Sequence, residues 1–91
     1  MNENDAEAGL VEISGDADLD NRFLTEMKAR HGDEIKLKSV DFSGRFSDWQ
    51  EVLRYGESLR HHEPYHFEQP SRDMRVSAEF TKRVDLPVTW H

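Results

Sequence analysis

The stretch that most constrains the fold is Ser47–His62, which reads SDWQEVLRYGESLRHH and has the pattern of one amphipathic helix. Ser47 can accept a hydrogen bond from a free backbone N–H of the first turn, and Gln50 three residues later completes a capping box. Pro64 stops further helix. An apolar stripe recurs at helical spacing and consists of Trp49, Val52, Leu53, Gly56 and Leu59. Glycine within this stripe predicts close packing against a strand or a second helix.

A second helix is expected over roughly Asp18–His31, because Asp16 or Asp18 can cap its start and Gly32 follows its end. Short strands are predicted at residues 10–13 and 34–42, where apolar residues cluster or alternate, and residues 64–70 are predicted to form a further short extended piece. The clearest alternation lies near the C-terminus, in Met74, Val76, Ala78 and Phe80 and then in Val84, Leu86, Val88 and Trp90. This pattern predicts two further strands, the last of them at an edge of the sheet.

These elements predict an α+β fold, a two-layer sandwich in which two helices pack on a four- to five-stranded mixed or antiparallel sheet. The expected order is β-α-β-α-β-β-β. The first eight residues are polar and acidic, so we expect residues 1–8 to form a disordered arm. Residues 9–91 are then expected to form a single small α+β domain.

The formal net charge of −7 is concentrated at the start of the chain. The first 20 residues carry seven acidic side chains and no lysine or arginine. This distribution argues against nucleic-acid binding, which needs a basic face, and favours attraction to a basic protein surface. No apolar run reaches the length of a membrane span, and cysteine is absent, so we expect no membrane association and a cytoplasmic location.

The function predicted from these features is a small acidic, non-enzymatic protein-binding module, such as an inhibitor, an antitoxin-like or immunity-like protein, or an accessory subunit. Neither a nucleophile elbow nor a glycine-rich phosphate loop is present, so we expect no catalytic residues and no cofactor. Acidic side chains would steer association and aromatic ones would anchor it. The candidate partner-binding residues are Asp16, Asp18, Asp20, Tyr55, Tyr65 and Trp90.

Two alternatives stay open. Imidazole nitrogens are good ligands for zinc or nickel, and His61, His62 and His66 lie within six residues of one another. A small metal-binding domain built on these histidines is therefore one alternative. The other is a structural homodimer that pairs through the C-terminal edge strand.

Overall fold

The computed structural model describes all residues from Met1 to His91. Helices and strands alternate along the whole chain. In order they are α1 (Glu3–Ala8), β1 (Leu10–Glu12), α2 (Ala17–His31), the 3₁₀ turn η1 (Gly32–Glu34), β2 (Ser39–Asp41), α3 (Trp49–Leu59), the 3₁₀ turn η2 (Arg60–His62), β3 (Phe67–Glu68), α4 (Met74–Arg83) and β4 (Val88–Thr89).

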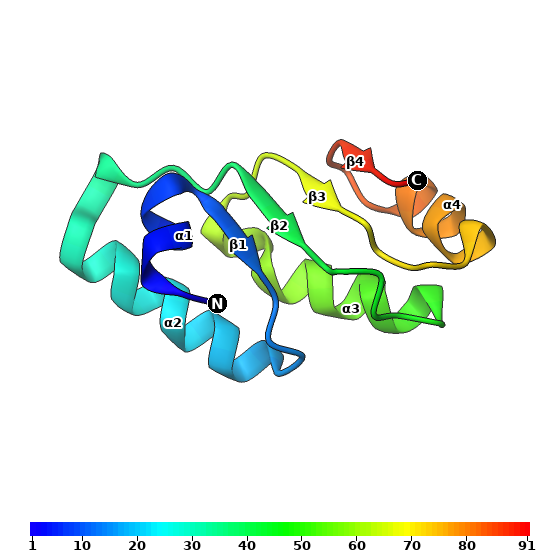
Figure 1. The fold of residues 1–91 in the computed structure, drawn as a ribbon, viewed down its shortest axis with the longest axis horizontal. Coiled ribbons are helices and arrows are strands. Elements are labelled where there is room, and N and C mark those ends of the chain that lie inside the picture. The colour runs from blue at the N-terminus through cyan, green and yellow to red at the C-terminus, as the bar shows by residue number, and fades with distance from the viewer.

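The four strands form one parallel sheet in the order β1-β2-β3-β4 (Figure 1). Each pair of neighbouring strands is joined by a helical crossover. Because such crossovers are right-handed and always step in one direction here, they place α2, α3 and α4 on the same face of the sheet. The core lies between the sheet and these helices, and α1 adds Ala6 to it.

The two helices predicted from their caps are present. Asp16 caps α2 by accepting hydrogen bonds from the backbone of Asp18 and Leu19, and Gly32 follows its last residue with a φ of 58°. In α3 the cap is Asp48, one residue beyond the predicted Ser47. A Cβ at Gly56 would lie 3.4 Å from the rings of Phe67 and Phe80. The close packing expected at this glycine is therefore present.

The prediction of a strand over residues 74–81 is wrong, because this segment forms helix α4. Asp73 caps it by accepting a hydrogen bond from the backbone of Arg75. Val76 and Phe80 are buried one helical turn apart, whereas Met74 is 65% exposed. The alternating pattern was misleading because apolar residues four apart satisfy a helical period as well as a strand period.

The predicted fold class is also wrong, because the sheet is neither mixed nor antiparallel and four helices accompany it. A helix connects every two successive strands, and this connection is what parallel pairing requires. Of the two strands expected near the C-terminus, only the second is present, and it is shorter than expected. Only Val88–Thr89 forms a strand, and it pairs in parallel with Phe67–Glu68.

Residues 1–8, expected to be a disordered arm, form helix α1 and pack against the domain. Asn2 caps the helix, and Ala6 is only 2% exposed. Glu3 makes an ion pair of 2.9 Å with Arg30 of α2. No helix in the structure combines the length and the apolar composition needed to cross a membrane.

The burial pattern of α4 gives a direct test of the helix. Phe80→Ala should lower the free energy of unfolding by about 3–5 kcal/mol, because it empties a fully buried site. Met74→Ala should change it by less than about 0.5 kcal/mol, because its side chain is exposed. Urea denaturation followed by circular dichroism measures both. A large loss in both variants would support the strand instead, since a strand places both side chains on one face.

Candidate functional site

The carboxyl ends of the strands carry a row of polar side chains, which we call the strand-end row: Glu12, Asp41, Glu68 and Thr89. Parallel pairing aligns these residues, because Glu12 is opposite Asp41, Asp41 is opposite Glu68, and Glu68 is opposite Thr89. Each follows a strand residue that packs in or against the core: Val11, Val40, Phe67 and Val88. Since successive residues point to opposite faces, the row lies on the face that the helices leave uncovered.

Serine hydroxyls and one backbone amide hold the carboxylates of this row. The Ser43 hydroxyl donates a hydrogen bond to Oε1 of Glu12, and the Ser43 backbone N–H donates one of 2.7 Å to Oδ1 of Asp41. The Ser39 hydroxyl donates one of 2.8 Å to Oε1 of Glu68. The three acidic side chains, together with Asp5 of α1, line an open depression at this edge of the sheet.

His66 lies on the same face, just before β3. Its Nδ1 is 3.2 Å from the Ser39 hydroxyl and 3.6 Å from Oε1 of Glu68. Its Nε2 is hydrogen-bonded to the hydroxyl of Thr89. One imidazole, the group that most readily exchanges protons near neutral pH, is therefore connected to the carboxylates of the row.

A buried network fixes the loop that follows β1. The Tyr55 hydroxyl donates a hydrogen bond of 2.5 Å to Oδ2 of Asp20, and the Ser14 N–H donates one of 3.0 Å to the same oxygen. The Gly15 N–H donates to the Tyr55 hydroxyl at 3.2 Å. Burial raises the pKa of Tyr55 well above its ordinary value of 10.0, and the hydrogen bond and negative charge of Asp20 raise it further. The network therefore holds α2, α3 and the end of β1 together.

The donor atoms of the strand-end row are of the type that a hard cation takes. Its donors are carboxylate and hydroxyl oxygens, which are the ligands that Mg²⁺ and Ca²⁺ prefer. In sheets of parallel strands alternating with helices, ligands bind at the carboxyl ends of the strands. The location and the donor atoms therefore indicate the same kind of site.

Two of the predicted partner-binding residues are unavailable to a partner. Asp20 is 1% exposed and Tyr55 is 9% exposed, and they bond to each other. This placement corrects their assignment, because a buried carboxylate needs internal donors and the Tyr55 hydroxyl supplies one. Asp16 is the cap of α2, and Asp18 is exposed in its first turn.

The two other predicted anchors lie at the surface. Tyr65 is 56% exposed, whereas Trp90 is half-buried and its Nε1–H donates to the Thr81 hydroxyl at 3.1 Å. A basic protein partner and a homodimer through the β4 edge stay predictions.

The three histidines predicted to bind one metal ion do not converge. His61 and His62 stack at the end of α3 with ring centroids 4.0 Å apart, and Nε2 of His62 lies 2.8 Å from Oδ1 of Asn21. His66 lies on the uncovered face of the sheet instead. After Pro64 the chain enters β3, which carries His66 away from His61 and His62. The prediction that these three histidines form one metal site is therefore wrong. Burial, and then the positive charges of His61 and Lys28, lower the pKa of His62 from 6.5 to about 4.

Sequence reasoning missed the strand-end row as a site. A signal for it exists, because an apolar residue directly followed by an acid ends three successive strands, as Val11-Glu12, Val40-Asp41 and Phe67-Glu68. This signal has meaning only once the strands are known to be parallel and in register.

Comparisons with known proteins bear on the fold. No protein-family model matches the chain, and no curated protein sequence matches it. Solved structures do match, and three of them are enzymes. They are a dipeptide epimerase from Enterococcus faecalis V583 (TM-score 0.77, 18% identity), an L-talarate dehydratase from Polaromonas sp. JS666 complexed with Mg and L-glucarate (0.73, 21%) and a muconate cycloisomerase from Azorhizobium caulinodans (0.71, 18%).

The matches cover 89%, 90% and 96% of this chain but only 24%, 24% and 26% of the respective enzymes. The chain therefore spans about a quarter of their length. At these identities the likeness shows a shared fold. Because the proteins that share it are enzymes, the comparison contradicts the prediction of a non-enzymatic, inhibitor-like protein-binding module.

The Asp20–Tyr55 bond predicts a specific effect on stability. Tyr55→Phe should lower the free energy of unfolding at pH 7 by about 1–3 kcal/mol, because it leaves the buried carboxylate short of a donor. The wild type should also lose stability above pH 10, since the unfolded phenol ionises there while the folded one keeps its proton. Urea titrations at pH 7 and about pH 10.5 measure both effects. Tyr65→Phe is the matched control, and an equal loss in that variant would argue against the network.

The half-buried imidazole of His62 predicts acid sensitivity. Between pH 6.5 and about 4 the unfolded state binds a proton that the folded state excludes, so stability should fall as the pH falls through this range. His62→Gln should reduce that fall, whereas His91→Gln, which removes an exposed histidine, should not. Urea denaturation at several pH values tests the difference. Parallel curves for the wild type and His62→Gln would exclude this role of His62.

Proposed function

We propose that this chain is part of an enzyme domain in which the strand-end row binds a divalent cation, Mg²⁺, that in turn binds a small carboxylate substrate. The observation that carries the proposal is the alignment of Glu12, Asp41 and Glu68 on three adjacent parallel strands, at their carboxyl ends. The uncovered face of the sheet leaves the three carboxylates accessible from the side opposite the core.

The topology supports an enzymatic role. Strands in sequential order, all parallel and with their helices on one face, have the arrangement of a sector of a (β/α)₈ barrel. In such barrels the active site lies at the carboxyl ends of the strands, and residues from several strands contribute to it. The strand-end row occupies the corresponding position in this sheet.

The donor atoms of the row are of the type that Mg²⁺ takes, and side-chain rotations would bring them together, because the three carboxylates do not all lie within 4.8 Å of one another. The cation favours carboxylate oxygens and keeps several waters, so two or three carboxylates on adjacent strands are sufficient to hold it. Asp41 and Glu68 are the central members of the row, and Glu12 and the hydroxyls of Ser39 and Ser43 flank them. When bound, the cation would polarise a substrate carboxylate and stabilise negative charge that develops next to it.

The structural neighbours support the substrate class. The named substrates and ligand of these enzymes (dipeptides, L-talarate, L-glucarate and muconate) are carboxylates, and one structure contains Mg. His66, which contacts Ser39 and Glu68, is the group of this chain best placed to exchange a proton beside the row. Because the chain spans about a quarter of the length of these enzymes, we assign to it the cation ligands and not a complete substrate pocket. We further propose a cytoplasmic location, which the cysteine-free sequence supports.

Binding of Mn²⁺, used as a paramagnetic substitute for Mg²⁺, tests the proposal. The wild-type chain should bind Mn²⁺ and release it on addition of excess Mg²⁺, as followed by the electron paramagnetic resonance signal of the free ion. Asp41→Asn and Glu68→Gln should each weaken binding by roughly tenfold or more, since each removes a charged ligand.

Glu57→Gln is the matched control, because it removes one exposed carboxylate of α3 at no cost to the row. Circular dichroism checks that each variant is folded. If Asp41→Asn and Glu68→Gln bind Mn²⁺ as tightly as Glu57→Gln does, the row is not the cation site.

A further inference from the structure

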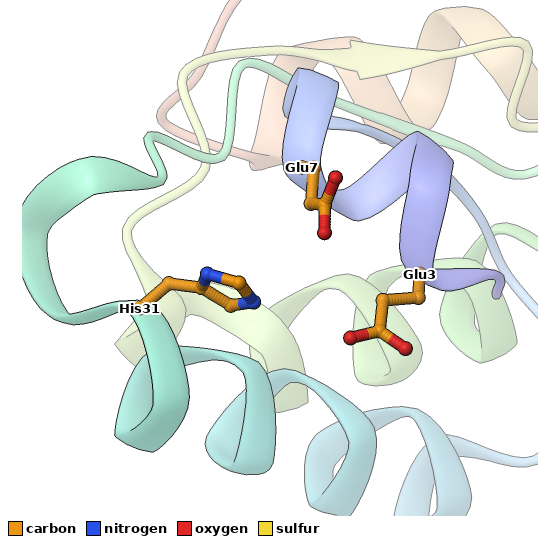
Figure 2. Close-up of side chains that lie close together, drawn as sticks. All are labelled: Glu3, Glu7 and His31. Atoms are coloured by element: carbon orange, nitrogen blue, oxygen red, sulfur yellow. The ribbon is translucent and has the colours of Figure 1, made fainter.

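A second cluster of metal-ligating side chains lies where α1 meets the end of α2. Figure 2 shows Glu3 and Glu7 on α1 and the imidazole of His31, the last residue of α2, pointing toward them. One ligand atom from each residue lies within 4.8 Å of the other two. It is the only group of three or more His, Asp or Glu side chains in the chain that meets this distance.

Local structure explains why these three side chains converge. Glu3 and Glu7 are four residues apart, so they lie on the same face of α1. Gly9 ends the helix in a left-handed conformation, and its carbonyl accepts hydrogen bonds from Lys38 and Ser39. Ala6, which lies on a neighbouring side of the same helix, is buried in the core. The short helix is therefore fixed next to the end of α2.

The imidazole supplies an independent observation. Nε2 of His31 is buried and has no hydrogen-bond partner, and it is the only buried side-chain nitrogen or oxygen in the structure without one. Buried polar atoms nearly always have a partner. Because no other group of the structure bonds to this nitrogen, it is available as a ligand for a cation placed among the three side chains.

The ion pair of Glu3 with Arg30 leaves carboxylate oxygens of the cluster available to a cation. One oxygen of Glu3, Oε1, contacts Arg30 at 2.9 Å, and Arg30 also lies 3.6 Å from Glu26. The side chains of Arg30 and Glu3 are 56% and 50% exposed, and exposed pairs of this kind contribute little. The other oxygen of Glu3 and the carboxylate of Glu7 have no partner among the side-chain hydrogen bonds and ion pairs of the structure.

We propose that Glu3, Glu7 and His31 bind Zn²⁺, with water in the fourth position. Zinc takes imidazole nitrogen and carboxylate oxygen together, whereas Mg²⁺ favours oxygen alone. Tetrahedral bonds of about 2.0–2.2 Å place ligand atoms about 3.4 Å apart, so small side-chain rotations bring these three atoms into position. The ion joins the two helices and stabilises the packing of α1. The site shares no residue with the strand-end row.

Isothermal titration of the full chain with zinc chloride, in the presence of excess Mg²⁺ to occupy the strand-end row, tests the proposal. We expect one Zn²⁺ per chain. His31→Gln and Glu7→Gln should each weaken binding by roughly tenfold or more, because each removes one of three ligands. Glu26→Gln is the matched control: it also removes a carboxylate near Arg30, but this carboxylate is not part of the cluster, so zinc affinity should be unchanged.

Two further measurements separate this site from other binding and from loss of fold. Zinc should raise the midpoint of thermal unfolding of the wild type and of the Asp41→Asn/Glu68→Gln double variant, but not that of His31→Gln. Co²⁺ should give visible absorption bands with the wild type that His31→Gln lacks. The proposal is overturned if the wild type binds no zinc, if folded His31→Gln binds it as tightly as the wild type, or if only the double variant loses it.

Discussion

The packing of one helix layer on one face of the parallel sheet is the constraint on which the rest of this structure depends. At its centre the rings of Phe42 and Phe67 lie 5.1 Å apart, and Phe80 lies 5.7 Å from each of them. These three rings come from the end of β2, from β3 and from α4, so they join segments that are distant in sequence. Gly56 lets α3 approach Phe67 and Phe80 closely, and a larger side chain there would separate the helix from the sheet.

Core and candidate site are two consequences of the same strand register. In each strand a residue that packs in or against the core is followed by one that faces away from it, because the side chains of a strand alternate between faces. The register that buries Val40 and Phe67 therefore presents Asp41 and Glu68 on the uncovered face. A slip of one residue would bury the carboxylates and expose the core, so burial of the core specifies the position of the row.

The positions of α2, α3 and the first strands could be predicted from local signals, whereas the orientation and pairing of the strands could not. Capping residues and an apolar stripe located α2 and α3 to within a few residues, because these signals depend on neighbours in sequence. In α4 the same kind of reading failed, since Val76 and Phe80 fit both periods and only the packing partner decides between them. Strand orientation and register depend on long-range pairing, and the strands are only two or three residues long. The alignment of Glu12 with Asp41 and Glu68 was therefore beyond the reach of local patterns.

From the sequence, the acidic residues among the first 20 were expected to attract a basic protein surface. The structure gives several of them other roles. Asp16 caps a helix and Asp20 bonds to Tyr55 in the interior, so these acids are needed by the fold. Glu12 belongs to the strand-end row, and Glu3 and Glu7 belong to the cluster around His31. On our two proposals these last three carboxylates face cations and not a protein partner. Each divalent ion would offset two negative charges. Part of the net charge of −7 therefore belongs to side chains that we propose as cation ligands.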